Sequence, residues 1–421
     1  MNRFAIIGFG CGGYNALRSI RQADSEAQVD IYSDTALPPY NPMLTTYYIK
    51  GKIPFEALFP FGSIAEIEKE YNCHVYQNTK VVSLDTAKHD LVLSDESRRH
   101  YDKILIATGA EAVNLPVGDL PAERVFTMRT VQDAARLKTE LDRGTCTSAL
   151  VVGASMVGIK IVELLAERGI RCTMSDLADH IFPTAAFLTV SEKIESYLRG
   201  RGINLRFGVK TDAAQQKDGI GHITFSDGST MTADIVIMCV GTRAAIRWLN
   251  PEQIKMNRAV VVDETMQTSA PGIYAAGDCC EGNDLMQGTT RNIGLWANAY
   301  VQGAIAGSSM AGVPAQGEGN ILHNITHFMD MDFVSFGDKS LPGERVVFLD
   351  EGNKYIEATV RDGRLQCINM LNDFEYSGMV KNCIMHCFSQ NPEPLTVQEE
   401  GQLAKSGLPN ALIRILEGMA E

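Results

Sequence analysis

The sequence predicts an α/β protein with two doubly wound parallel-sheet domains, followed by a smaller α+β domain. Two observations predict this arrangement. First, a unit of apolar strand, glycine-rich turn, helix, second strand and acid begins near the N-terminus and occurs again about 145 residues later. Second, the chain changes in texture after residue 318, where strand-like runs and helices follow without further glycine turns.

The first unit opens with the apolar run 4–7, which is typical of a buried parallel strand. It ends in a G-x-G-x-x-G turn made of Gly8, Gly10 and Gly13. Gly8 permits a tight turn, Gly10 lets a pyrophosphate approach the backbone, and Gly13 lets the next helix lie close to the sheet. The free N–H groups of that helix then face the phosphates. The turn therefore predicts dinucleotide binding.

Acids and small residues follow where such a ligand needs them. Asp30 and Asp34 come at the distance expected for a carboxylate on the adenosine ribose. The proline-containing loop 37–52 includes a short helix at 44–49, which either covers the cofactor or is part of an ordinary surface loop. A strand over 101–106 ends in Ala107-Thr108-Gly109, where small side chains allow close approach of a ligand to the backbone.

The second unit repeats this order. A strand over 149–152 leads into a turn with Gly153, Ser155 and Gly158, followed by a helix over 159–168. A further strand ends at Asp176. Two nucleotide-binding units in one chain indicate two nucleotides that meet at one place, in two Rossmann-like domains.

The remaining elements are expected at fixed places along the chain. Helices are predicted at 187–200 and 295–311, and two more near the C-terminal end, the first opened by the capping box of Thr396 and Glu399. Strands are predicted at 72–106 (several short ones), 204–209, 222–225, 233–240, 259–262, 273–276, 346–349, 355–360 and 365–371.

Composition excludes some classes of partner. The net charge of −13 argues against nucleic acid and against an anionic membrane surface. No stretch approaches the ~20 apolar residues of a membrane span. The first strand begins by Arg3 or Phe4, which leaves no room for a signal peptide, so the cytoplasm is expected. The ten cysteines form no C-x-x-C pair and no disulfide framework.

The order of these motifs resembles the FAD-dependent pyridine nucleotide-disulfide oxidoreductase superfamily over about residues 1–312. Both glycine turns, Ala107-Thr108-Gly109 and the run from Thr268 to Asp278 occur in family order. The loop with Pro39-Tyr40-Asn41 and Gly51-Lys52 is most similar to the branch of NADH oxidases, rubredoxin and ferredoxin reductases, and nitrite reductase flavin domains.

The resemblance implies two cofactors, FAD and NADH, with NADPH less favoured because the Asp176 carboxylate repels a 2′-phosphate. It implies that Gly8, Gly10, Gly12 and Gly13 hold the FAD pyrophosphate, and that Asp34 and Val81 lie at its adenosine. The other positions implied to hold FAD are Thr46, Ala107, Thr108, Gly109, Gly277 and Asp278. The positions implied to hold NADH are Gly153, Ser155, Gly158 and Asp176, and Gly241 is a further cofactor-binding position.

The resemblance also implies a domain order and a reaction. The FAD-binding domain is split between 1–118 and 252–318, the NAD(P)H-binding domain covers 119–251, and 319–421 resembles a dimerisation domain, so a homodimer is expected. Hydride passes from NADH to the flavin and electrons then pass to an acceptor, either a small iron–sulfur protein or a partner subunit. Two alternatives are an NADH oxidase that reduces oxygen and a low-turnover nucleotide-sensing flavoprotein that binds a partner.

Three departures from the family pattern bear on the chemistry. Thr45-Thr46 stands where one branch has its reactive cysteine, so thiol chemistry is not expected there. Ser155 replaces the second glycine of the second turn. Lys160 stands in place of the family's glutamate, and we interpret it as a catalytic residue that brings positive charge to the flavin. The alternative is a helix lysine that reaches solvent.

Two cysteine pairs remain open. Cys279 and Cys280 are adjacent, so a disulfide between them is strained, and they are either a redox pair or buried small side chains. Cys383 and Cys387 lie on one helical face, which indicates a core stripe rather than a metal site, since two thiolates are too few for zinc or an iron–sulfur cluster. No metal is expected.

Overall fold

The structure, a computed structural model, describes residues 2–115, 118–217, 219–389 and 395–418. The chain forms two compact units. The first contains residues 1–111 and 242–320, and the second contains residues 112–241 and 321–421. Each unit therefore holds one of the two glycine turns.

The first unit is built on a five-stranded parallel sheet in the order β19-β7-β1-β2-β3. Its strands are β1 (Arg3–Ile7), β2 (Gln28–Tyr32), β3 (His74–Tyr76), β7 (Lys103–Ile106) and β19 (Ile273–Ala275). The side chains of β1, β2, β7 and β19 are almost wholly buried, as expected where both faces of a parallel sheet are covered, whereas the edge strand β3 exposes His74. All five carboxyl ends lie at one edge of the sheet.

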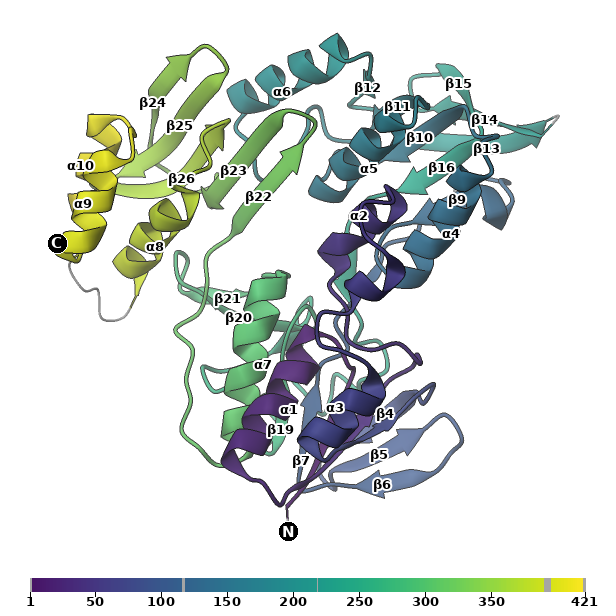
Figure 1. The fold of residues 1–421 in the computed structure, drawn as a ribbon, viewed down its shortest axis with the longest axis vertical. Helices are drawn as coiled ribbons and strands as arrows, with labels where there is room; N and C mark the ends of the chain where they lie inside the picture. The colour runs from purple at the N-terminus through teal and green to yellow at the C-terminus, as the bar shows by residue number, and fades with distance from the viewer. Residues whose placement is uncertain (1, 116–117, 218, 390–394, 419–421) are drawn as a thin grey trace. The chain divides into compact units, whose positions relative to one another are not determined.

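Helices α1 (Cys11–Ala23) and α7 (Trp296–Met310) lie side by side on this unit (Figure 1). Glycines make this close approach possible. A Cβ at Gly303 would lie 2.2 Å from the carbonyl oxygen of Gly12, and a Cβ at Gly307 would lie 2.3 Å from that of Ala16. The glycine-rich start of α1 is thus held from behind by α7.

The rest of the first unit consists of short elements. A three-stranded antiparallel sheet contains β4 (Val81–Asp85), β5 (Asp90–Leu93) and β6 (Arg98–His100). Another contains β18 (Val260–Val261), β20 (Cys280–Asp284) and β21 (Thr289–Arg291). The helical pieces are η1 (Pro42–Leu44), α2 (Thr45–Ile49), η2 (Phe55–Leu58) and α3 (Ile64–Tyr71), and the short strand β17 (Thr242–Ala244) pairs with β8 (Ala110–Ala112).

The second unit contains a second parallel sheet in the order β12-β11-β10-β16-β9. Its strands are β9 (Val125–Thr127), β10 (Ser148–Val152), β11 (Arg171–Ser175), β12 (Asn204–Arg206) and β16 (Ile235–Met238). The helices of this part are η3 (Ala122–Arg124), α4 (Val131–Asp142), α5 (Met156–Glu167) and α6 (Leu188–Gly200). An antiparallel sheet of β13 (Thr211–Lys217), β14 (Ile220–Phe225) and β15 (Thr230–Ala233) follows.

Residues 321–421 belong to the same compact unit as this second glycine turn. They form an antiparallel sheet in the order β22-β23-β26-β25-β24. The strands are β22 (His323–Phe328), β23 (Met331–Gly337), β24 (Glu344–Glu351), β25 (Lys354–Arg361) and β26 (Arg364–Leu371). The helices are α8 (Ser377–Phe388), α9 (Val397–Lys405) and α10 (Asn410–Gly418). The predicted capping box of Thr396 and Glu399 is present at the start of α9.

The α/β class with two parallel sheets is confirmed, but several elements were not predicted from the sequence. The hairpin of β22 and β23 was not anticipated. Helices α3 and α4 were also missed, although each begins at a capping box, Ser63 with Glu66 and Thr130 with Asp133. Those boxes are the signal that could have revealed them.

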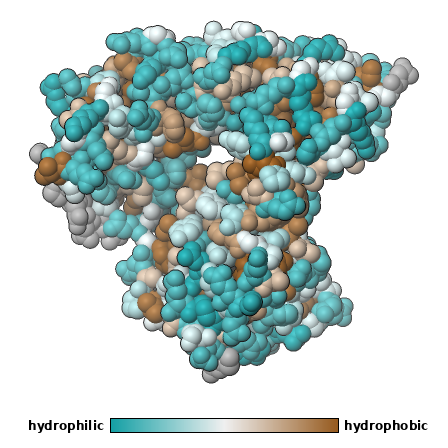
Figure 2. Space-filling model, in the orientation of Figure 1, coloured by the Kyte–Doolittle hydropathy of each residue, from teal (hydrophilic) through white to brown (hydrophobic). Residues whose placement is uncertain are grey.

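Among the residues that the structure describes, no helix is both long and apolar enough to cross a membrane. Hydrophilic side chains cover most of the face drawn in Figure 2, with apolar side chains scattered between them. All ten cysteines are free thiols, and nine of them are buried.

Candidate functional site

Two glycines of the first turn, Gly8 and Gly13, cannot be replaced without a clash. Gly8 has a φ of +100°, and a Cβ there would lie 2.3 Å from the carbonyl oxygen of Ala107. A Cβ at Gly13 would lie 2.3 Å from the carbonyl oxygen of Gly8. These two glycines are therefore required by the packing of β1, α1 and β7.

Gly10 is different, because nothing lies within 4 Å of the position that its Cβ would take. It is the N-cap of α1, it offers no side-chain cap, and the first turn of the helix carries no acidic residue. Open space therefore lies beside Gly10 at the start of α1, where the positive end of the helix dipole is. A phosphate group fits this place.

The other residues expected to hold FAD lie at the same edge of the sheet, after β7 and β19. The Ala107 N–H donates to the Ile7 carbonyl oxygen at 2.7 Å, and the Thr108 hydroxyl donates to the Ala245 carbonyl oxygen at 2.9 Å. After β19, the Gly277 N–H donates to Oε1 of Gln302 in α7 at 2.9 Å. This contact fixes the start of the segment that carries Asp278.

The structure separates the two acids that the sequence left open for the ribose. Asp30 is buried in β2, where it accepts a hydrogen bond from the Tyr101 hydroxyl at 2.7 Å. Asp34 is exposed two residues after β2. Asp30 therefore serves the core, and Asp34 is the acid available to a ligand. Val81 lies buried at the start of β4 and Thr46 lies buried in α2.

The second turn repeats the geometry of the first at two of its three positions. Gly153 has a φ of +115°, and its Cβ would lie 2.3 Å from the carbonyl oxygen of Cys239. A Cβ at Gly158 would lie 2.1 Å from the carbonyl oxygen of Gly153. Gly241, three residues after the end of β16, also has a positive φ, of +98°.

Ser155 makes the second turn unlike the first. As N-cap of α5, its hydroxyl oxygen accepts a hydrogen bond from the Gly158 N–H at 3.1 Å, and the hydroxyl donates to the Cys239 carbonyl oxygen at 2.9 Å. The Gly158 N–H at the start of α5 therefore already donates to a side chain of the protein. In the first turn, Gly10 has no side chain that could accept the corresponding N–H of α1.

Asp176, directly after β11, is tied to the same turn. One carboxylate oxygen accepts the Ala154 N–H at 2.7 Å and the other accepts the Ala178 N–H at 2.8 Å. Each carboxylate oxygen can accept a further hydrogen bond, so the acid can also bind a ribose hydroxyl. The expected ribose acid and the expected pyrophosphate turn are therefore one hydrogen-bonded structure.

Lys160 was expected either at the flavin or in solvent, and the structure shows it in a largely buried ion pair. Its ammonium group is 2.5 Å from Oε2 of Glu163 and donates to the His327 carbonyl oxygen at 2.6 Å. Its side chain is 18% exposed, so it is not a helix lysine that reaches solvent. Its charge is paired within α5 and with the β22–β23 hairpin, and a role at the flavin stays a prediction.

The adjacent cysteines are placed as buried thiols. Cys279 donates to the Ile106 and Ala276 carbonyl oxygens, and Cys280 donates to that of Gly277. Burial raises the pKa of the Cys279 thiol to about 11 and raises that of Cys280 well above its ordinary value. Both thiols stay protonated at neutral pH and are poor nucleophiles.

The second pair, Cys383 and Cys387, is buried on one face of α8 with Val380 and Ile384. This is the core stripe that the sequence predicted.

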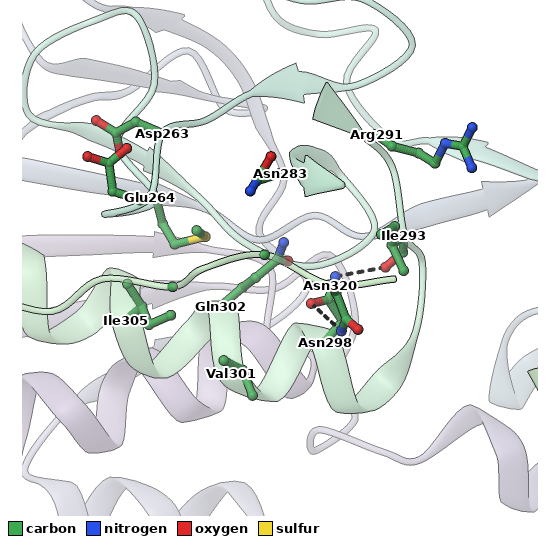
Figure 3. Close-up of a pocket in the computed structure, with 14 residues that line it drawn as sticks. Asp263, Glu264, Asn283, Arg291, Ile293, Asn298, Val301, Gln302, Ile305 and Asn320 are labelled. Carbon is green, nitrogen blue, oxygen red and sulfur yellow. Dashed lines mark hydrogen bonds between the residues drawn. The ribbon is translucent and has the colours of Figure 1, made fainter. Parts of the chain in front are cut away.

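A small hollow lies in the first unit beside α7 (Figure 3). Asn298 in α7 lines this hollow. It donates to the Ile293 carbonyl oxygen at 2.9 Å and accepts a hydrogen bond from Asn320 at 3.2 Å. Gln302, which holds Gly277, also lines it. None of the residues expected to hold FAD lines this hollow, so it is separate from the glycine turn.

The comparisons agree with this geometry. The family model described as pyridine nucleotide-disulphide oxidoreductase matches residues 2–303. An NADH oxidase of Methanocaldococcus jannaschii is 27% identical over 319 residues, which are 75% of this chain and 71% of that protein. The NADH-dependent phenylglyoxylate dehydrogenase subunit epsilon of Aromatoleum evansii is 25% identical over 91% of both chains.

Two solved structures share the fold. The water-forming NADH oxidase from Lactobacillus brevis bound to NADH has a TM-score of 0.86 at 20% identity, over 100% of this chain and 98% of that one. A putidaredoxin reductase in covalent complex with putidaredoxin has a TM-score of 0.83 at 20% identity, over 91% of this chain and 93% of that one.

The chain belongs to the pyridine nucleotide-disulphide oxidoreductase family. It is a flavin-dependent NAD(P)H oxidoreductase, as its relatives are. The open space at Gly10 fits the pyrophosphate of a dinucleotide such as FAD, and the second turn repeats the close glycine contacts of the first at Gly153 and Gly158.

Proposed function

We propose that this chain takes hydride from NADH and passes electrons, through FAD, to a separate redox protein or partner subunit. The observation that carries the proposal is the pair of glycine turns, each at the carboxyl edge of its own parallel sheet, with an acid beside each. When bound, FAD supplies the chemistry, since it can accept a hydride and release electrons to an acceptor. The protein supplies position and charge.

The residues have separate tasks in this proposal. Gly10 and the start of α1 hold the FAD pyrophosphate, and Asp34 binds its ribose. The backbone of Ala107, Thr108 and Gly109 lies beside the FAD phosphates, and Asp278 binds the ribityl chain. Gly153 and Gly158 hold the pyrophosphate of the nicotinamide nucleotide.

NADH is proposed as the donor rather than NADPH. The support is Asp176, whose carboxylate lies against the Ala154 N–H of the turn. A carboxylate can accept a hydrogen bond from a 2′-hydroxyl but repels a 2′-phosphate.

A separate acceptor is supported by the absence of cysteines from residues 12–72, where Thr45 and Thr46 lie in α2. The chain therefore offers no thiol in that segment to carry the electrons onward. A relative of nearly full-length coverage is named as one subunit of a dehydrogenase, and a structural neighbour is a reductase bound to a small redox protein.

Oxygen is the second proposed acceptor, because one relative is named an NADH oxidase. A low-turnover nucleotide sensor is the third alternative. Homodimer formation and a cytoplasmic location are also proposals. The ten free cysteines support a reducing compartment, in which thiols stay unpaired.

An anaerobic titration of the FAD-loaded protein with NADH tests the proposal. We expect stoichiometric bleaching of the visible flavin band, followed by fast reoxidation on addition of rubredoxin or a ferredoxin and slow reoxidation by air. Fast reoxidation by air with consumption of oxygen identifies an oxidase. A flavin band that NADH leaves unbleached contradicts the reductase and favours the nucleotide sensor.

A further inference from the structure

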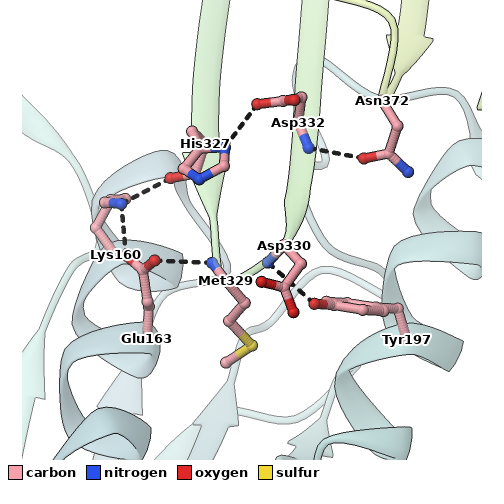
Figure 4. A network of polar contacts seen from close by, with 8 residues as sticks. All are labelled: Lys160, Glu163, Tyr197, His327, Met329, Asp330, Asp332 and Asn372. Carbon is pink, nitrogen blue, oxygen red and sulfur yellow. Dashed lines mark hydrogen bonds and ion pairs between the residues drawn. The ribbon is translucent and has the colours of Figure 1, made fainter.

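The hairpin of β22 and β23 reaches α5 through a buried acid (Figure 4). Glu163 is 5% exposed, and its Oε2 lies 2.5 Å from the Lys160 ammonium group. Its Oε1 accepts the Met329 N–H, from the tip of the hairpin, at 2.7 Å. Lys160 in turn donates to the His327 carbonyl oxygen at 2.6 Å. A buried carboxylate with these partners holds α5 and the hairpin in one register.

The same hairpin holds a second element beside the glycine turn. Phe182 is 1% exposed and has a φ of +51°, a backbone conformation that a bulky residue rarely adopts. Its ring stacks on Phe333 of β23 at 5.0 Å and meets Phe328 of β22 edge-on at 6.1 Å. Packing against both strands holds this strained residue in place.

The Glu163 contacts and the packing of Phe182 both connect the hairpin to the second glycine turn. The Phe182 N–H donates to the Ala154 carbonyl oxygen at 2.9 Å, and Ala154 lies between Gly153 and the Ser155 cap. Glu163 lies in the helix that begins at this turn. The turn is therefore fixed from two sides by one hairpin of the C-terminal sheet.

We propose that Glu163 is a positioning residue for the dinucleotide site, and that the β22–β23 hairpin buttresses the turn that binds the pyrophosphate of NADH. This inference rests on the proposed function and adds that nucleotide affinity depends on the C-terminal sheet. Loss of the Glu163 contacts frees the start of α5 to shift, and binding must then order it again.

The test compares two contacts of the same hairpin. Glu163→Ala removes the buried contact. Arg201→Ala is the matched control, because Arg201 at the end of α6 pairs with Asp330 at the hairpin tip but both side chains are about half exposed or more. The affinity of FAD-loaded protein for NAD⁺, which cannot reduce the flavin, is measured by calorimetry. KM for NADH and kcat are measured with ferricyanide as acceptor.

We expect Glu163→Ala to raise Kd for NAD⁺ and KM for NADH about tenfold, with kcat at saturating NADH within about twofold of the parent. Glu163→Gln keeps an acceptor for the Met329 N–H, so it should restore most of the affinity. Arg201→Ala should leave Kd within about twofold. This pattern differs from a purely structural role, which lowers the melting temperature without a change in Kd.

The inference is overturned if Glu163→Ala binds NAD⁺ like the parent, or if Arg201→Ala weakens binding equally. If Glu163→Ala does not fold, Glu163→Met takes its place, because methionine fills similar space without an acceptor for the Met329 N–H, and a Kd within about twofold of the parent then overturns the inference. A parent protein that does not bind NAD⁺ at all defeats the proposed nucleotide site and the inference together, so the two failures are distinguishable.

Discussion

The Ala154 N–H donates a hydrogen bond of 2.7 Å to the Asp176 carboxylate, across 22 residues of sequence. The acid that is proposed to select the ribose is therefore also a support of the turn that is proposed to hold the pyrophosphate. Substitution of Asp176 can separate the effect of its charge from the effect of its hydrogen bond, because asparagine retains a hydrogen-bond acceptor but carries no charge.

The first prediction concerns nucleotide preference. Asp176→Asn should lower the ratio of kcat/KM for NADH to that for NADPH at least about tenfold, or about 1.4 kcal/mol, because the repulsion of a 2′-phosphate is removed. Asp176→Ala should lower the ratio similarly and also weaken NADH binding, because the Ala154 N–H loses its acceptor. Steady-state kinetics with both nucleotides check this. An unchanged ratio in Asp176→Asn would place the selecting charge elsewhere.

The second prediction concerns the FAD cradle. Gly10→Ala should leave the fold intact, because no atom outside its two chain neighbours lies within 4 Å of the added Cβ and the φ of −93° is allowed for alanine. The new methyl group instead enters the space left for the pyrophosphate. We expect FAD content after purification to fall at least about tenfold while far-UV circular dichroism is unchanged.

A matched control is available in α6. Gly200 also has open space at its Cβ position and no positive φ, but it lies at the end of a helix away from any glycine turn. Gly200→Ala should retain full FAD content. Equal FAD content in Gly10→Ala and Gly200→Ala would show that the pyrophosphate does not pass Gly10.

Local sequence was sufficient to predict both turns and not sufficient to predict what holds them. Gly8, Gly13, Gly153 and Gly158 are required by contacts within a strand–turn–helix unit, so their spacing alone carries the information. The contact of Lys160 with the His327 carbonyl oxygen joins residues 167 positions apart. No periodicity in either segment signals it.

For Lys160, the sequence could have predicted its ion-pair partner but not the burial of that pair. Its pairing with Glu163 at a spacing of three residues on one helix could have been read from the sequence. The burial of that pair could not, because it depends on a hairpin that the sequence pattern did not reveal. Ser155 was noted as a departure from glycine, and its role as the cap of α5 becomes clear from its hydrogen bond to Gly158.

The third prediction concerns that cap. Ser155→Ala should destabilise the second unit by about 1 kcal/mol, since the Gly158 N–H loses its acceptor, whereas Ser155→Gly should cost only a few tenths of a kcal/mol. Both changes open the Gly158 N–H to a ligand, as in the first turn. We therefore expect Ser155→Gly to bind NAD⁺ more tightly than the parent, measured by calorimetry. Weaker binding would mean that the hydroxyl itself contacts the nucleotide.

The fourth prediction concerns stability at acid pH. Burial, followed by the nearby positive charge of Lys381, lowers the pKa of His323 to about 4 from an ordinary value of 6.5. Its Nδ1 lies 3.0 Å from the Ile321 carbonyl oxygen, and its Nε2 lies 3.4 Å from the Lys381 ammonium group. The folded state thus keeps this imidazole neutral, so that Nδ1–H donates to the carbonyl and Nε2 accepts from Lys381.

The sign of the effect follows from the two pKa values. Between about pH 6.5 and pH 4 the unfolded chain binds a proton at His323 that the folded chain does not, so the stability of the fold decreases as the pH falls through this range. The loss from pH 7 to pH 5 should be about 2 kcal/mol from this residue. His323→Gln, which cannot titrate, should therefore lose less stability than the parent over the same range, measured by urea denaturation followed by circular dichroism. Equal losses in the two proteins would mean that His323 titrates normally in the folded state, which would require that water reaches its Nε2 in spite of Lys381.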